Sequence, residues 1–243
     1  MRKNETQTVH EVFNQLKIEK SSTISNQDFK DHSPLISKKQ LWNEFLFEFK
    51  NIYGKEFIKC PDSVMNIKVL FLYFLQDMEF FNCEKLRSDL SCPSFKKGLF
   101  IIGGFGVGKT AYMKVFEKIF NKHKELRLKG YTAKELVNMY ESCATPSDKS
   151  YMMSTTVRPR LFIDDINSER IANNYGNCDV VEEILFNQNE KRYTTFVTSN
   201  HTNPENSMEE SIMDIGVRYG GRIHDRFYEM FNMIDFTGKS NRR

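Results

Sequence analysis

Apolar side chains recur at helical spacing through one part of the chain. Across residues 40–82 they lie three or four positions apart, as at Leu41, Phe45 and Phe49, which is the pattern of one helix face. Pro61 interrupts the pattern, because proline cannot continue a helix interior. The stretch therefore predicts two helices that meet near Pro61.

The first 38 residues are polar and rich in Ser, Asn and Lys. A stripe at positions i, i+3, i+4 and i+7 predicts one short amphipathic helix there, formed by Val9, Val12, Phe13 and Leu16. Residues 19–39 carry the turn residues of a linker. The helix either packs on its own chain or docks in a groove of a partner protein, and both possibilities stay open.

From residue 98 onward, short apolar runs alternate with helical patterns. Four runs predict buried strands: Gly98–Ile102, Leu126–Tyr131, Arg160–Ile163 and Thr194–Thr198. Helices are predicted over Ala111–His123 and Val180–Asn189, and a third begins at Thr132, where Thr132 and Glu135 can form a capping box. This alternation predicts β-α-β crossovers and a parallel sheet that is covered on both faces.

The sequence thus predicts three parts. Residues 1–38 form a polar tail with the short helix and the linker, and residues 39–92 form a helical region. Residues 93–243 form a three-layer α/β domain with a parallel sheet.

Composition narrows the class of protein without identifying it. With 40% hydrophobic and 28% charged residues, the chain is typical of a soluble globular protein. The net charge of +3 is too small to indicate nucleic-acid binding, so any DNA contact must come from local patches. Five cysteines without a C-x-x-C pair predict buried thiols and no disulfide or zinc site. No signal peptide or membrane span is visible, so we expect a cytoplasmic protein.

Candidate phosphate chemistry follows the first predicted strand. Gly103–Thr110 reads G-G-F-G-V-G-K-T between a strand and a helix, which is the context of a P-loop. Glycines let backbone N–H groups surround a phosphate, and the helix N-terminus attracts the same anion. Lys109 would reach the β- and γ-phosphates of ATP, and Thr110 would bind Mg²⁺. The expected nucleotide contacts are Gly103, Gly104, Phe105, Gly106, Val107, Gly108, Lys109, Thr110 and Ala111.

Two later strands end in polar side chains. Asp164 and Asp165 close an apolar run, which places both carboxylates at the edge of the sheet beside the P-loop. We expect Asp164 to bind Mg²⁺ through water and Asp165 to orient or deprotonate the attacking water. Asn200 follows another strand and can hold the same water, or it can be a plain strand-end cap.

Three arginines near the C-terminus lie four positions apart. Arg218, Arg222 and Arg226 would share one helix face, but Gly220 and Gly221 argue against a continuous helix, so a helix is predicted from Arg222. Such arginines either form a solvated surface or reach a γ-phosphate bound by another subunit.

Together these motifs resemble the DnaC/DnaI helicase-loader family of AAA+ ATPases, with the transposition-helper ATPases of insertion sequences as close kin. The segments that carry the resemblance are Gly103–Thr110, Leu161–Asp165, Thr198–Asn200, Tyr219–Arg226 and Gly238–Arg243. The resemblance implies that Asn200 is sensor 1, Arg226 the arginine finger, Arg222 its companion and Arg242 a sensor 2 candidate. It also implies a subunit or partner beside the ATP, a replicative helicase as partner, and single-stranded DNA.

The sequence departs from the family in two places, and these keep alternatives open. Asp165 stands where many relatives have Glu, and Phe186–Glu190 lacks an arginine that is common there. The alternatives are a transposition helper or an ATP-gated scaffold with weak turnover. A small-molecule kinase is a further alternative, for which Ser147–Ser150 with Arg158 and Arg160 would be a thin lid.

Overall fold

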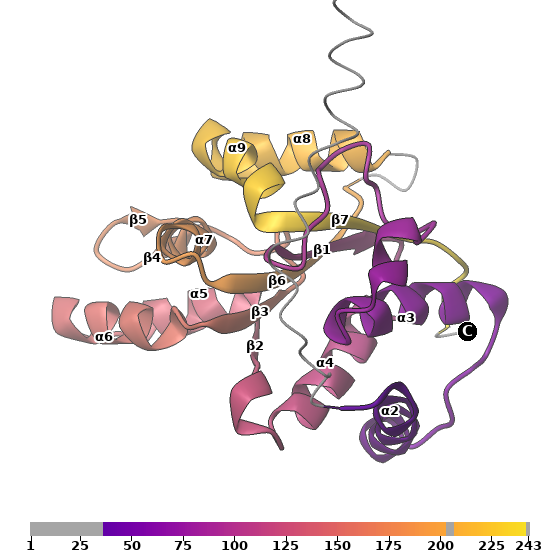
Figure 1. Ribbon diagram of the computed structural model, residues 1–243. Helices are drawn as coiled ribbons and strands as arrows, with labels where there is room; N and C mark the ends of the chain where they lie inside the picture. The colour runs from indigo at the N-terminus through magenta and orange to yellow at the C-terminus, as the bar shows by residue number, and fades with distance from the viewer. Residues whose placement is uncertain (1–35, 203–206, 242–243) are drawn as a thin grey trace, which may run out of the picture. The chain divides into compact units, whose positions relative to one another are not determined.

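Five parallel strands form the central sheet of the computed structural model, in the order β2-β3-β6-β1-β7. The strands are β1 (Gly98–Gly103), β2 (Lys129–Thr132), β3 (Arg160–Asp164), β6 (Thr194–Asn200) and β7 (Phe231–Phe236). β1 lies between β6 and β7, so the P-loop emerges beside the ends of both neighbours (Figure 1). The α/β class and the parallel sheet are confirmed.

The structure describes residues 36–202 and 207–241. The predicted helix with Val9 and Leu16, most of the predicted linker, and Arg242 lie outside the described residues. The residues from Ile36 onward form one compact unit. Whether residues 39–92 and 93–243 are separate domains stays a prediction.

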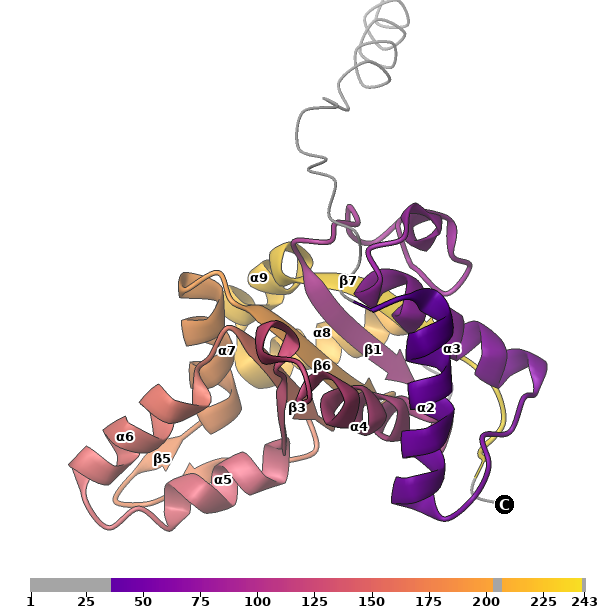
Figure 2. The same cartoon turned by 60° about the horizontal axis from the view of Figure 1, so that its bottom comes forward.

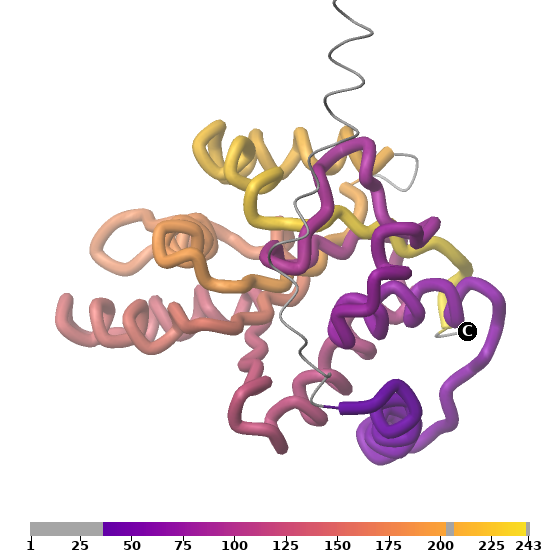
Figure 3. Tube along the Cα trace, viewed as in Figure 1, coloured from indigo at the N-terminus to yellow at the C-terminus, as the bar shows by residue number. Residues whose placement is uncertain are grey.

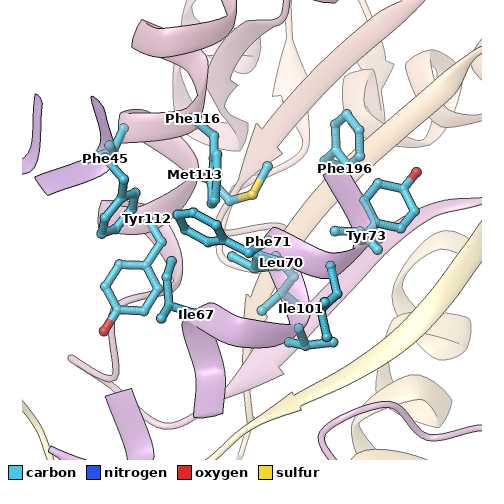
Figure 4. Close-up of a cluster of buried hydrophobic side chains, with 14 of the residues drawn as sticks. Phe45, Ile67, Leu70, Phe71, Tyr73, Ile101, Tyr112, Met113, Phe116 and Phe196 are labelled. Atoms are coloured by element: carbon cyan, nitrogen blue, oxygen red, sulfur yellow. The ribbon is translucent and has the colours of Figure 1, made fainter. Parts of the chain in front are cut away.

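Side chains of the strands alternate between two hydrophobic cores. Leu99 and Ile101 face one core, and Phe100 and Ile102 face the other. The first core lies under α3 (Pro61–Phe74) and α4 (Lys109–Phe120), and α2 (Lys38–Tyr53) packs on α4 (Figure 2). This first core is aromatic. The ring centroids of Phe45, Phe71 and Phe116 lie 5.3–5.6 Å from one another (Figure 4).

The second face of the sheet is covered by helices that come later in the chain. These are α5 (Ala133–Glu141), α7 (Val180–Glu190), α8 (Met208–Tyr219) and α9 (Gly221–Met230), with α6 (Pro146–Thr156) against α5. A short hairpin joins β4 (Ala172–Asn173) to β5 (Asn177–Cys178). Short 3₁₀ helices occupy Met78–Asn82 (η1) and Lys124–Leu126 (η2). The predicted three-layer arrangement is therefore confirmed.

Most predicted elements lie where the pattern placed them. Pro61 is the first residue of α3, Thr132 caps α5 with Glu135 as its capping-box partner, and Gly220 separates α8 from α9. The strand expected over Leu126–Tyr131 is wrong in its first half, because η2 ends at Leu126 and β2 begins only at Lys129.

Two other expectations are corrected. Ser147–Ser150, the proposed kinase lid, lies in α6, which Thr145 caps with Asp148. The five cysteines are free, but they are half-buried or, at Cys92, exposed instead of buried. No helix among the described residues is long and apolar enough to cross a membrane.

Candidate functional site

The P-loop connects β1 to α4 at the centre of the sheet. Gly106 and Gly108 have φ values of 80° and 105°, which glycine adopts readily. A Cβ at Gly108 would lie 2.4 Å from the ring of Tyr112, so this position also needs glycine for space. α4 begins at Lys109, and the N-terminal end of a helix, with its N–H groups and positive dipole end, is a favourable site for anions.

Lys109 is 6% exposed and its ammonium group lies inside the loop. Its Nζ donates to the carbonyl oxygens of Gly103 and Gly104, at 2.7 and 2.8 Å, and to Asn200 Oδ1 at 2.9 Å. Gly103 and Gly104 thus meet the lysine through their carbonyls. The contact joins the P-loop to the end of β6, as the prediction for Asn200 requires.

Thr110 and Asp164 meet at the end of β3. Thr110 Oγ1 donates to Asp164 Oδ1 at 2.8 Å, and Thr198 Oγ1 donates to the same oxygen at 2.6 Å. A hydroxyl and a carboxylate are ligands that suit Mg²⁺, which also takes water and phosphate oxygens. No group of three or more His, Cys, Asp or Glu side chains that could hold a metal occurs among the described residues. Thr110 and Asp164, the two predicted metal residues, carry the ligand types that would suit a magnesium ion.

Asp165 is held beside this pair in an uncommon backbone conformation. Its φ of 59° lies in the left-handed region, and its N–H donates to Thr198 Oγ1 at 2.9 Å. Asn200 Nδ2 donates to Asp165 Oδ1 at 2.5 Å, and Ser168 Oγ donates to Oδ2 at 3.0 Å. Asn200 therefore bridges Lys109 and Asp165, and one hydroxyl, that of Thr198, organises both aspartates.

A cavity of about 540 Å³ contains these groups. Its polar wall comes from the P-loop, β3 and β6, and includes every residue from Phe105 to Ala111 with Asp164, Asp165 and Asn200. Its apolar wall comes from α2 and the segment after it, with Phe49, Tyr53, Phe57 and Ile58. Burial, and next the charge of Asp164, raise the pKa of the Tyr53 hydroxyl, so this wall lies near the metal residues.

Sequence reasoning missed this apolar wall, and it also missed the role of the C-terminal segment. Asn241 lines the cavity, its N–H donates to Gly106 O at 3.0 Å, and Lys55 Nζ donates to Asn241 O at 3.5 Å. Upstream, Asn66 Nδ2 donates to Thr237 O at 2.8 Å, so the segment after β7 runs beside α3 (Figure 3). In the sequence analysis, only the family-like segment Gly238–Arg243 pointed to this part of the chain.

Arg218, Arg222 and Arg226 lie elsewhere, on α8 and α9, and none of the three lines the cavity. Arg226 Nη2 pairs with Glu190 Oε1 on α7 at 2.9 Å. Arg222 is exposed, with its guanidinium 5.9 Å from the Phe186 ring. Arg218 pairs with Glu169 and Asp179, which gives it a structural role.

Tyr219, which begins the Y-G-G-R segment, is buried and connects α8 to the loop after β3. Its hydroxyl donates to Glu169 Oε1 at 2.6 Å and accepts from the N–H of Asn167 at 2.8 Å. Burial, and next the carboxylate of Glu169, raise the pKa of this hydroxyl well above its usual value. The helix pair that carries the arginines is thus tied to the strand that carries Asp164 and Asp165.

This chain is similar to several solved structures. No protein-family model matches the chain, and no curated protein matches it either. Among solved structures, the DnaC helicase loader aligns with a TM-score of 0.54 and 22% identity, over 82% of this chain and 99% of that chain. DnaI aligns with a TM-score of 0.42 and 25% identity, over 60% and 73% of the two chains. AMPPCP-bound DnaA from Aquifex aeolicus aligns with a TM-score of 0.40 and 14% identity, over 76% and 50%.

The alignment with DnaC spans nearly all of that structure and has a TM-score above 0.5, so it bears on the fold of this chain. The P-loop and the two strands that end in Asp164 and Asn200 lie together, as the motifs require. The resemblance to the DnaC/DnaI group is confirmed at the level of the fold, and this chain is a P-loop α/β protein with the fold of the DnaC helicase loader.

Proposed function

We propose that this protein binds ATP with Mg²⁺ and hydrolyses it. The observation that carries the proposal is one connected set of hydrogen bonds around the cavity, in which Asn200 joins Lys109 to Asp165. Such a set brings a cation, an amide and a carboxylate to the place where a P-loop holds the γ-phosphate.

The side chains divide the work in this proposal. Lys109 and the N–H groups at the start of α4 bind the phosphates, and Thr110 and Asp164 hold the metal. The metal, when bound, neutralises charge that develops on the phosphate oxygens. Asp165 and Asn200 orient the attacking water, since both lie within one hydrogen bond of each other at the rim of the cavity.

We further propose that the ATPase acts in the cytoplasm as a loader-like factor, with a replicative helicase and single-stranded DNA as partners. The likeness of the fold to DnaC and the Y-G-G-R and G-K-S-N-R motifs support this reading. Self-association through Arg226, with Arg222 as companion, belongs to it. No arginine among the described residues lines the cavity, and in this proposal a neighbouring copy supplies one.

The test is ATP hydrolysis at rising protein concentration, with and without single-stranded DNA. We expect turnover per subunit to rise with concentration and to fall by about 10³-fold or more in Arg226→Ala, the worth of an arginine finger. Arg127→Ala removes an exposed arginine elsewhere and should behave as wild type. Mixing Arg226→Ala with Asp165→Ala should restore turnover. The loader proposal is rejected if turnover per subunit does not depend on protein concentration or on DNA and is unchanged in Arg226→Ala. The protein would then be a self-contained ATPase.

One observation favours an alternative, an ATP-gated scaffold with weak turnover. Both carboxylate oxygens of Asp165 already accept hydrogen bonds, from Asn200 and from Ser168. Aspartate is also shorter than the glutamate of many P-loop ATPases. On this alternative Asp165→Asn binds ATP as wild type does and barely changes a turnover that is already slow; on the main proposal it abolishes turnover.

A further inference from the structure

Arg226 is held by the neighbouring helix α7 at two points. Its guanidinium carbon lies 4.1 Å from the ring centroid of Phe186, and its Nη2 donates to Glu190 Oε1 at 2.9 Å. α7 and α9 pack side by side (Figure 2), so both contacts fit one placement of the arginine. A stacked and ion-paired guanidinium has a fixed plane and a fixed direction.

The second terminal nitrogen of the same guanidinium is buried without a partner. Arg226 Nη1 finds no hydrogen-bond acceptor among the described residues. A buried donor without an acceptor is unfavourable, and more so when the group is charged. One donor of the guanidinium is therefore unused in this placement. This lowers the free energy needed to move the Arg226 side chain away from α7.

In this placement Arg226 is turned toward its own chain. Nη2 pairs with Glu190 and Nη1 is enclosed, so the guanidinium can present both terminal nitrogens to a phosphate only if the side chain turns away from α7. Glu190 itself is about half exposed, with 53% of its side chain accessible, so the ion pair can open to solvent. Arg222, by contrast, is exposed and 5.9 Å from the same ring.

We propose that Glu190 and Phe186 hold Arg226 in a retracted position, and that association with a nucleotide-bound copy releases it. The inference rests on the proposed function, in which Arg226 acts in trans. On release, the guanidinium exchanges one anion for another, the carboxylate of Glu190 for the γ-phosphate held by the neighbour. Glu190 and Phe186 are then restraining residues that touch neither substrate nor metal.

The first experiment separates the arginine donor from the subunit that hydrolyses ATP. The acceptor is Arg226→Ala, whose own cavity is intact, and the donor is Asp165→Ala, which carries Arg226 but lacks the water-orienting carboxylate. Adding Glu190→Gln to the donor should lower the concentration for half-maximal stimulation by about 2- to 5-fold, the worth of a partly exposed ion pair. The maximal stimulated rate should stay the same. Phe186→Leu in the donor should act in the same direction.

The matched control is Glu183→Gln in the donor. Glu183 is an exposed glutamate two turns earlier on α7, so the variant removes the same charge from the same helix without touching Arg226. It should leave the half-maximal concentration unchanged. An equal effect of both variants, or a lower maximal rate with Glu190→Gln, would overturn the restraint.

A second measurement needs no ATPase activity. Nitrogen-15 NMR of the arginine side chains should show hindered rotation of the Arg226 guanidinium in the full chain, and free rotation in Glu190→Gln but not in Glu183→Gln. If the unmodified donor fails to stimulate the acceptor, Arg226 does not act in trans. The proposed retraction of Arg226 is then wrong as well. If stimulation works while Glu190→Gln changes neither the signal nor the titration, only the retraction is wrong.

Discussion

Around the cavity the polar side chains are paired with one another, whereas Arg226 of α9 is paired away from it. Lys109, Asn200 and Asp165 form one connected set, and Thr198, which also contacts Asp164, joins this set through the N–H of Asp165. Arg226 instead contacts Glu190 and Phe186, on α7.

This difference separates the contacts that a single chain makes on its own from those that require a second copy of the chain. The groups that would bind phosphate and metal are already in contact within a single chain. Arg226 would contribute only after a change of partner. Binding of ATP and its fast hydrolysis should therefore respond to different substitutions, and the following experiments, from the largest expected effect to the smallest, test this separation.

Lys109→Ala should reduce both ATP hydrolysis and ATP binding, because it removes the ammonium group that lies inside the P-loop. We expect turnover to fall by about 10²–10³-fold, as when a preorganised donor to a developing charge is lost, together with weaker ATP binding. Calorimetric titration with ATP and a turnover assay measure both. Lys114→Ala, an exposed lysine on the same helix, is the control and should match wild type. Tight ATP binding by Lys109→Ala would show that the paired set is not the phosphate site.

Thr198→Val should weaken the fold and the metal site together. The valine keeps the shape of the side chain but leaves Asp164 Oδ1 without one donor and the N–H of Asp165 without an acceptor. We expect a loss of about 1–3 kcal/mol in unfolding free energy and a higher Mg²⁺ concentration for half-maximal ATP binding. Urea denaturation and a Mg²⁺ titration measure the two effects.

Thr195→Val is the matched control for that experiment. Thr195 lies on the same strand, is buried and accepts from Gln188 Nε2 at 2.9 Å, away from the cavity. It should cost similar stability without changing the Mg²⁺ dependence. Equal Mg²⁺ effects of both variants would mean that the strand as a whole, and not the Thr198 hydroxyl, sets the metal site.

His201, next to Asn200, gives the smallest effect. Burial lowers its pKa below the usual 6.5; the charge of Lys109 lowers it further, and Asp235 opposes the shift. The unfolded chain then binds the proton more readily, so this contribution to stability is present above about pH 6.5 and is lost as the pH falls through the lowered pKa. NMR titration should show the pKa of His201 moving up in Lys109→Ala. An unchanged pKa of His201 in this variant would mean that the charge of Lys109 lies too far from His201 to affect it.

Much of the cavity was predictable because its signals are local in sequence. The P-loop is eight consecutive residues between a strand and a helix, and Asp164 and Asp165 close an apolar run. The capping box at Thr132 was read in the same way. Thr145 and Asp148 carry an equivalent signal with Pro146 between them, which would have revealed α6.

The remaining features depend on contacts that no local pattern encodes. Thr198 meets Asp164 across 34 positions, and the Tyr219 hydroxyl meets Asn167 across 52, so their roles arise only when the strands and helices pack. The apolar wall with Tyr53 and Phe57 comes from a segment that carries only a helical pattern and a turn. The sequence could predict the chemistry of the phosphate end but not the surface against which the rest of a nucleotide would lie.

The position of α2 and α3 has a consequence for how proteins of this fold can be recombined. Phe45 and Phe71 share one aromatic core with Phe116 of α4, directly behind the P-loop, and the segment between the two helices lines the cavity. A chimaera that replaced residues 38–74 with helices from another protein of this fold would change both the aromatic core and the wall of the cavity. Residues 38–74 should therefore be inherited together with the rest of the described chain.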